Sequence, residues 1–191
     1  MISYFPEIYE VVYSWFARYF AHSGYPCYMN ALEDLFIKRN CAADIEFIGP
    51  INQEAKSIME SICTMDKLIF EHTMFPQYAR FLDSDRQKIA IESLIVGGGD
   101  PHNLLSVPTS SSTRVIRYCP LCAQEDREKY GETYFHRSHL IRGIMTCTKH
   151  KCKLRNTKVE ISKCRSPRLH VPEDVIPITT FCDDDISASE A

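Results

Sequence analysis

The chain has 191 residues, of which 45% are hydrophobic, a composition that can bury a core and that excludes a disordered chain. No apolar run approaches the roughly 20 residues that cross a bilayer and the N-terminus lacks a secretory signal, so we expect a cytoplasmic protein with no membrane contact. The net charge of −3 hides a basic block, because residues 114–170 hold 14 lysines and arginines against 5 acidic residues, between two acidic segments.

Residues 1–96 are predicted to form a helical domain of about five short helices. The spacing of apolar residues and the cap signals predict helices over 7–22, from Asn30 to Phe36, from Asn52 to Ile62, from Thr64 to His72 and from Ser84 to Val96. Ser23-Gly24 supplies the first stop, and Ser84 with Gln87 has the spacing of a capping box. Short helices joined by tight turns are compatible with a helix-turn-helix and also with a scaffold that touches no DNA, which we favour slightly.

The second half changes in character. Residues 97–112, rich in Gly, Ser, Thr and Pro, are predicted to be a linker, and residues 113–182 a zinc-finger domain with short strands at 113–118, 133–135 and 144–147. Residues 183–191 are acidic and poor in apolar side chains, which predicts a disordered tail. The expected fold class is therefore mainly α with a small zinc-binding module: a helical N-terminal half followed by a zinc-ribbon-like, β-poor domain.

Two pairs of chelating residues have the spacing of a metal site. Cys119 and Cys122 are separated by two residues, as are Cys147 and His150, so that each pair can present two ligands to one tetrahedral ion from a tight turn. Three thiolates and one imidazole would fill all four positions of one structural Zn²⁺ ion and leave none for a catalytic water. Cys152 could replace His150 if the turn were different. His136 and His139, between the pairs, are more typical of packing residues than of ligands.

Basic side chains surround these pairs and alternate with tyrosines. This composition suits contacts with DNA phosphates, but an acidic protein partner fits it equally well. The candidate contact residues are Arg114, Arg117, Arg137, Arg142, Lys149, Lys151, Lys153 and Arg155.

The sequence argues against an enzyme. It contains no His-Glu-x-x-His, no Gly-x-Ser-x-Gly and no Walker motif, and a zinc deaminase would need a His-x-Glu upstream of its cysteines. The carboxylates of Asp83, Asp85 and Asp100 could form a nuclease-like metal cluster, but capping and turn roles explain them more simply. We therefore predict a protein without a catalytic site.

Several of these motifs resemble the TniQ/TnsD family of target-selection proteins from transposons. The resemblance rests on Arg117-Tyr-Cys-Pro-Leu-Cys122, Lys129-Tyr-Gly-Glu132, Phe135-His-Arg137, and Cys147-Thr-Lys-His150 followed by Leu154. Upstream, Phe5-Pro6 and the stretch from Leu68 to Tyr78 are similar to the N-terminal region of the TnsD branch. The sequence departs from the family pattern at Lys151, where glycine is common, at Thr148, where proline is common, and at Phe135-His136.

The resemblance implies an adaptor that brings an AAA+ ATPase of the TnsC type to double-stranded target DNA in a prokaryotic cell, acting at the nucleoid. It also implies that Cys119, Cys122, Cys147 and His150 are the zinc ligands. Because TnsD-like members carry a long further C-terminal region, the chain is either a short adaptor that uses other target-recognition components or part of a longer protein. The alternative function is a sequence-specific DNA-binding regulator that uses a zinc site and a helix-turn-helix.

Overall fold

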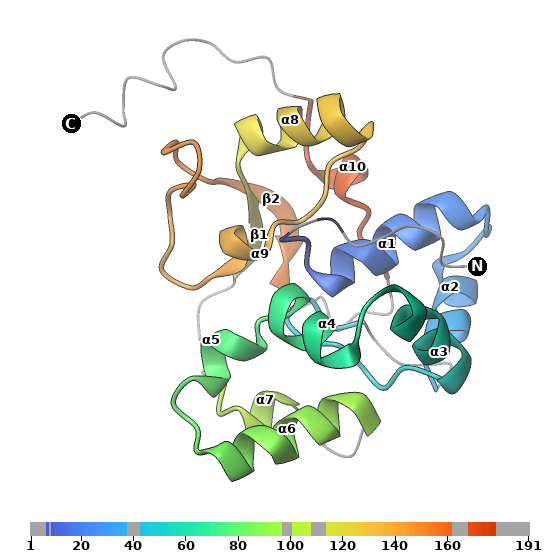
Figure 1. Cartoon of the computed structure of the whole chain (residues 1–191). Coiled ribbons are helices and arrows are strands. Elements are labelled where there is room, and N and C mark those ends of the chain that lie inside the picture. The colour runs from blue at the N-terminus through green and yellow to red at the C-terminus, as the bar shows by residue number, and fades with distance from the viewer. Residues whose placement is uncertain are drawn as a thin grey trace.

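The structure is a computed structural model, which describes residue 7 and residues 9–37, 43–96, 101–107, 114–161 and 168–178. Within these residues the chain is mainly helical with one small sheet, as expected (Figure 1). The helices are α1 (Val12–Ser23), α2 (Tyr28–Leu35), α3 (Gln53–Ile62), α4 (Met65–His72), α5 (Phe75–Ala79), α6 (Ser84–Val96), α7 (Pro101–Leu104), α8 (Pro120–Tyr130), α9 (Arg137–Leu140) and α10 (Pro172–Val175). The strands are β1 (Val115–Tyr118) and β2 (Arg155–Glu160).

Local capping signals position three helix ends as the sequence predicts. The Asn52 side chain accepts a hydrogen bond from the Ala55 N–H at the start of α3, and Thr64 Oγ1 accepts one from the Lys67 N–H at the start of α4. Gly24 follows α1 in the left-handed conformation with φ 73°, which glycine adopts without steric cost. These confirmed boundaries depend only on neighbouring residues.

Two predicted caps are wrong. Asn30 lies inside α2, whose N-cap residue is Cys27, because an apolar helical face begins earlier at Tyr28. Asp83 replaces Ser84 as the cap of α6, since its carboxylate accepts from the Arg86 N–H at 2.8 Å. Gln87 is used instead to bond two carbonyl groups of the preceding turn, so it forms no capping box.

The core is built on the aromatic face of α1. Trp15, Tyr13 and Phe16 are fully buried, and the ring of Tyr13 stacks on that of Phe135 at 6.3 Å. The backbone follows the same contact, because the Val11 N–H donates to the Phe135 carbonyl and the Phe135 N–H to Ser14 Oγ. One hydrophobic cluster therefore includes side chains from residues 1–96 and 113–182, whose division into two domains stays a prediction.

A buried ion network reinforces this junction. Arg18 Nη1 lies 2.7 Å from a carboxylate oxygen of Glu10, and its Nε lies 2.9 Å from Glu132, in the loop after α8. Glu10 and Arg18 are almost inaccessible to solvent. Burial raises the pKa of Glu10 to about 7 although the charge of Arg18 opposes that shift. The network therefore joins α1 to the segment that follows α8.

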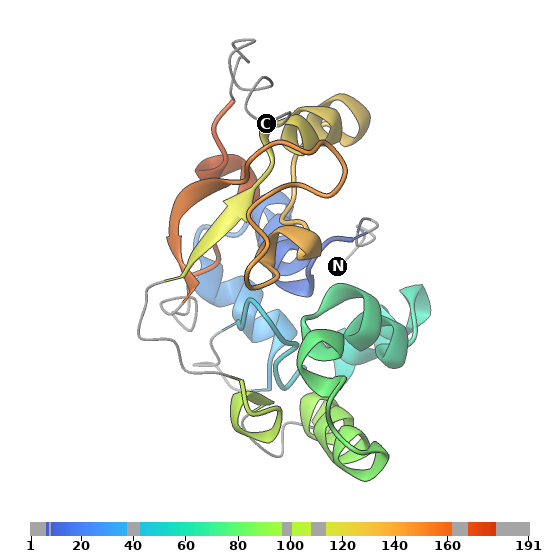
Figure 2. The ribbon, with the colours of Figure 1, turned by 90° about the vertical axis from the view of Figure 1, so that its left-hand side faces the viewer.

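The sheet consists of one antiparallel pair. Tyr118 pairs with Arg155 and Arg117 with Asn156, and the register shifts between Val115 and Arg117. The strand expected at 113–118 is confirmed for Val115–Tyr118. Figure 2 shows the sheet and α8 toward one end of the molecule and α6 and α7 at the other, with α1 between them.

Three expectations for the second half need correction or lie outside the described residues. The strands expected at 133–135 and 144–147 are not formed, because only isolated bridges occur there, between Glu10 and His136 and between Thr146 and Lys153. The predicted linker contains α7, while residues 97–100 and 108–113 and the predicted tail at 183–191 are not described. None of the described helices is long and apolar enough to cross a membrane.

Candidate metal centre

The first pair of candidate ligands lies at the start of α8. Cys119 is its N-cap residue, and the Cys119 Sγ accepts a hydrogen bond from the Cys122 N–H at 3.5 Å. Pro120 takes the first helical position, where its fixed φ suits the helix and its missing N–H is not needed. Because unpaired N–H groups at a helix start favour negative charge, this position suits thiolates.

The second pair lies on a tight turn between β1 and β2 in the sequence. The Cys147 N–H donates to the Cys152 carbonyl at 2.8 Å, and the Lys151 N–H donates to the Cys147 carbonyl at 2.9 Å. Inside this turn the His150 N–H points at Cys147 Sγ, 3.4 Å away. The backbone therefore presents one sulfur and one imidazole to the same side, opposite the first pair.

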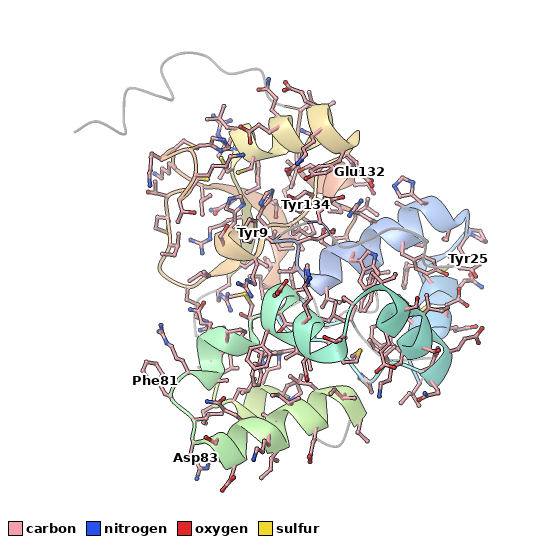
Figure 3. All side chains as sticks on the ribbon, viewed as in Figure 1. Tyr9, Tyr25, Phe81, Asp83, Glu132 and Tyr134 are labelled. Atoms are coloured by element: carbon pink, nitrogen blue, oxygen red, sulfur yellow. The ribbon has the colours of Figure 1, made fainter. Side chains whose placement is uncertain are left out.

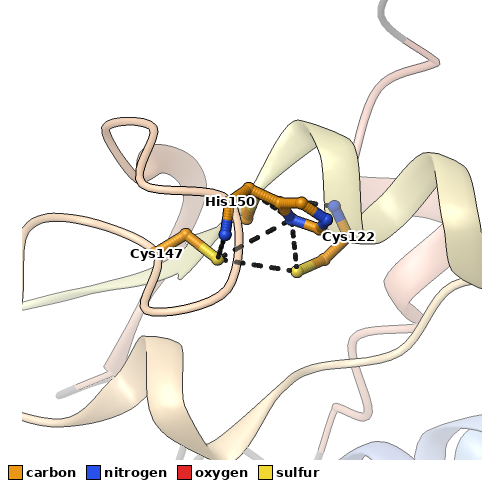
Figure 4. A group of neighbouring side chains, drawn as sticks. Cys122, Cys147 and His150 are labelled. Atoms are coloured by element: carbon orange, nitrogen blue, oxygen red, sulfur yellow. Dashed lines mark hydrogen bonds between the residues drawn. The ribbon is translucent and has the colours of Figure 1, made fainter. Parts of the chain in front are cut away.

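The four side chains converge on one point, and Figure 4 shows three of them, Cys122, Cys147 and His150, directed toward one another. Their donor atoms all lie within 4.8 Å of one another. Nδ1 of His150 is 3.4 Å from Cys119 Sγ, 3.3 Å from Cys122 Sγ and 3.8 Å from Cys147 Sγ, and the last two sulfurs are 3.7 Å apart. A tetrahedron with bonds of about 2.3 Å to sulfur and about 2.0 Å to nitrogen has edges of about 3.8 Å and 3.5 Å. The separations therefore fit one tetrahedrally bound ion.

The charges of the sulfurs also fit a cation. A hydrogen bond from Cys122 lowers the pKa of the Cys119 thiol to about 4, whereas that bond and burial raise the pKa of Cys122. Adjacent buried thiols cannot all ionise without compensating positive charge. A bound divalent cation would supply that charge and would release protons as the thiols ionise.

Two neighbouring side chains approach this group without joining it. Cys152 Sγ lies 3.3 Å from Cys119 Sγ, and burial raises the pKa of Cys152 to about 12, but its sulfur is not within reach of all four donors. His139 Nε2 lies 3.8 Å from Cys122 Sγ, and with His136 it forms a second cluster around that cysteine. Burial lowers the pKa of His139 to about 3, so its imidazole is neutral.

The sequence reasoning missed one residue that orients a candidate ligand. Glu125, one helical turn after Cys122 on α8, lies 3.0 Å from His150 Nε2 through its Oε1. A carboxylate on the far nitrogen of a metal-binding imidazole fixes its tautomer and leaves Nδ1 free to bind the ion. The i, i+3 spacing from Cys122 could have revealed Glu125, but only if α8 had been predicted.

The eight candidate contact residues are distributed over several environments. Arg114 forms an ion pair with Glu46 at 2.9 Å, and Arg117 donates to the carbonyl groups of Ile141 and Ile144. Lys149 forms an ion pair with Glu125. Lys151 and Lys153 are exposed on the turn, and Arg155 is half-buried near it. Arg137 and Arg142 line a separate pocket. Their contacts with DNA or a partner stay a prediction.

Lys151 occupies a backbone position that favours glycine. Its φ is 59°, in the left-handed region, immediately after His150. This conformation costs a residue with a Cβ about 1–2 kcal/mol, and glycine avoids that cost. Glycine also loses more conformational entropy on folding, which offsets part of the gain in stability. We therefore expect Lys151→Gly to raise the free energy of unfolding by roughly 0.5–1 kcal/mol in thermal or urea melts. A loss of stability would show that the Lys151 side chain makes a contact that outweighs the strain.

The comparisons with known proteins agree with the resemblance seen in the sequence. A family model described as TniQ matches residues 2–154, which include all four candidate ligands. Among curated proteins, the transposon Tn7 transposition protein TnsD of Escherichia coli is 29% identical over 145 residues, which cover 74% of this chain and 28% of that protein. The chain thus spans little more than a quarter of the length of this relative.

Proposed function

This chain belongs to the TniQ family, and on that premise we propose that it is a non-enzymatic adaptor of DNA transposition. In this proposal it helps to select the target site in the cytoplasm of a prokaryote by recruiting an AAA+ ATPase of the TnsC type to double-stranded DNA. Its similarity to a transposition protein over 74% of its residues supports this role. Other target-recognition components would act with it where its own DNA contacts are weak.

The observation that carries the proposal is a complete set of four metal donors within the residues that match the family model. Cys119, Cys122, Cys147 and His150 are three sulfurs and one nitrogen at tetrahedral separations, the ligand chemistry that Zn²⁺ prefers. A Zn²⁺ ion held by all four would have no open position, so it would stabilise a zinc-ribbon-like unit and supply no catalysis. Glu125 would hold the His150 ring in place for that ion.

The exposed lysines of the turn are the proposed weak DNA contacts. Lys151 and Lys153 are exposed beside the candidate metal centre, whereas Lys149 already pairs with Glu125. Each lysine that contacts a phosphate adds about one to the slope of log affinity against log salt. We expect Lys151→Gln with Lys153→Gln to weaken binding to a random duplex and to lower that slope by roughly 2.

Fluorescence anisotropy with a labelled duplex at several salt concentrations measures this slope. Lys67→Gln, on α4, is the matched control because Lys67 is exposed and pairs with Glu71 on its own helix. The proposed contacts are wrong if the control lowers the slope as much as the double variant does.

Retention of the ATPase tests the adaptor function itself. The metal-loaded chain is immobilised and the TnsC-type ATPase encoded with it is added, with and without ATP. We expect retention by the wild type and none by Cys122→Ser, whose loss of one ligand would unfold the zinc-ribbon-like unit. Cys63→Ser, at a half-buried cysteine after α3, should retain the ATPase normally. Sequence-selective DNA binding without ATPase retention would instead favour a regulator.

A further inference from the structure

The arginines of the described residues differ in their partners. Arg18, Arg114 and Arg127 each form an ion pair with a glutamate at 2.9 Å or less. Arg80, Arg137 and Arg142 have no carboxylate within 4.0 Å among the residues that the structure describes, and all three line one pocket. Arg117 also has none, but it does not line this pocket, and its guanidinium donates to the carbonyl groups of Ile141 and Ile144. This pocket therefore gathers an exposed arginine and two half-buried ones, none of them with a carboxylate partner in the described residues, which points to an anion supplied from outside.

The pocket has a volume of about 480 Å³ and lies between α5 and the segment around α9. Arg80 follows α5, Arg137 begins α9, and Arg142 comes two residues after α9. The buried side chain of Met74 and the half-buried Ile141 add apolar lining. In Figure 1, α9 lies above α5, and the pocket is lined from both segments, so residues far apart in the sequence build one recess.

Two of the guanidinium groups are held in position by neutral partners. Arg137 Nη1 donates to the Phe70 carbonyl at 2.5 Å, and Arg142 Nε donates to the Tyr78 hydroxyl at 3.2 Å. The nearby carboxylate of Glu46 is already used, because it pairs with Arg114 and accepts from the Tyr78 hydroxyl. The positive charge of Arg142 therefore remains available, and an anion would gain charge-assisted hydrogen bonds without reordering these side chains.

Aromatic side chains next to the pocket indicate the kind of partner. Phe81 is 82% exposed and carries the Arg80 guanidinium 4.7 Å above its ring, and Figure 3 shows it directed away from the body of the protein. Phe70, whose carbonyl binds Arg137, is 42% exposed. Arginine with exposed aromatic residues is the composition enriched in protein interfaces, and burying Phe81 would add apolar contact area.

We propose that the Arg80–Arg137–Arg142 pocket binds an acidic segment of a protein partner, with aspartate or glutamate carboxylates in the pocket and an apolar side chain against Phe81. The planar fork of arginine matches a carboxylate in a bidentate pair. A DNA duplex is the less suitable occupant, because its phosphates would have to enter a recess that Met74, Ile141 and Ile144 line in part. The inference rests on the proposed function only for the partner's identity, a protein of the transposition machinery.

A labelled peptide tests the pocket directly. The probe is a fluorescein-labelled decapeptide of aspartate, glutamate, leucine and phenylalanine, compared with the same peptide carrying asparagine and glutamine in place of the acids. We expect the acidic peptide alone to bind, and Arg80→Gln with Arg142→Gln to weaken it at least about tenfold. Arg86→Gln removes an exposed arginine of α6 outside the pocket and should change the affinity less than about twofold.

Melting temperature and metal content are measured on every variant, so that a loss of binding can be distinguished from a loss of folding. Arg137 is left unchanged in the test because its guanidinium also bonds backbone. No binding by the wild type, or equal binding by the double variant, overturns the proposal. It is also overturned if the double variant keeps the peptide but loses a random DNA duplex with a smaller salt slope, since the pocket would then hold phosphates.

The same variants separate this inference from the adaptor function. If the double variant retains the TnsC-type ATPase as the wild type does but loses the peptide, the pocket binds acidic segments of another partner and its assignment holds. If the wild type binds the peptide and never retains the ATPase, the adaptor function fails while the pocket stands.

Discussion

Removing the proposed Zn²⁺ ion is expected to unfold the part of the chain around the candidate metal centre. The four donors join the start of α8 to the turn at Cys147–His150, and the small cluster of buried side chains there is composed mainly of the cysteines themselves. Structural zinc sites bind their ion with about 10–16 kcal/mol near pH 7, as much as the roughly 5–15 kcal/mol that stabilises a whole domain. Without the ion, little apolar burial remains to hold this region.

Metal analysis and circular dichroism measure this effect. The purified chain should contain one zinc ion per molecule, and a strong chelator should remove it with a fall in melting temperature of more than about 10 °C. Cys122→Ser should prevent stoichiometric binding, while Cys63→Ser should leave both metal content and melting unchanged. A chelated, metal-free wild type that melts at the same temperature as the metal-loaded wild type would contradict a structural metal site.

Replacement of Arg18 is expected to have the second largest effect. Arg18→Met leaves the Glu10 carboxylate buried with no positive partner and releases Glu132. Breaking a buried ion pair on one side costs about 3–5 kcal/mol, far more than an exposed pair. Arg86→Met, which removes an exposed pair with Asp83, should cost less than about 0.5 kcal/mol. Urea unfolding at fixed pH compares the two.

The pH dependence of the stability tests whether the unpaired carboxylate of Glu10 causes this loss. Burial raises its folded pKa from 4.5 to about 7, so the folded chain holds one extra proton between these values. The stability from that proton is complete below about pH 4.5 and is lost as the pH rises through 7. Arg18→Met should raise the pKa of Glu10 further, so its cost should be larger at pH 8 than at pH 6.

A second substitution provides the matched control for this argument. Glu10→Gln removes the charge. Added to Arg18→Met, it should therefore recover part of the stability lost at pH 8 and should reduce the difference between the losses at pH 8 and pH 6. A double variant whose loss equals the sum of the two single losses at both pH values would show that Glu10 and Arg18 do not act as a pair.

Features encoded by neighbouring residues could be predicted from the sequence. Asn52 and Thr64 cap their helices through hydrogen bonds to the N–H three residues later, and Gly24 ends α1 with its own conformational freedom. The spacing within each chelating pair also depends only on a local turn. It therefore predicted which four side chains would meet, although the identity of their ion stays a proposal.

Features that depend on tertiary contacts could not be read in this way. α8 has little periodic apolar character, and it forms where its cysteines and Asp126 pack inward. The segment at 133–135 has strand-like residues but no strand partner, because its backbone bonds instead to the start of α1. The arginine pocket joins residues from α5 and α9 that are nearly sixty positions apart, and nothing in the local sequence around Arg80 indicated it.

The most direct test of the account is recruitment of the ATPase to DNA. A biotinylated target duplex is immobilised, and the TnsC-type ATPase is added with ATP at a salt concentration that prevents its own DNA binding, with or without the metal-loaded chain. We predict that the ATPase is captured only when the chain is present and that Cys122→Ser abolishes capture whereas Cys63→Ser does not. Equal capture with and without the chain would contradict the adaptor function.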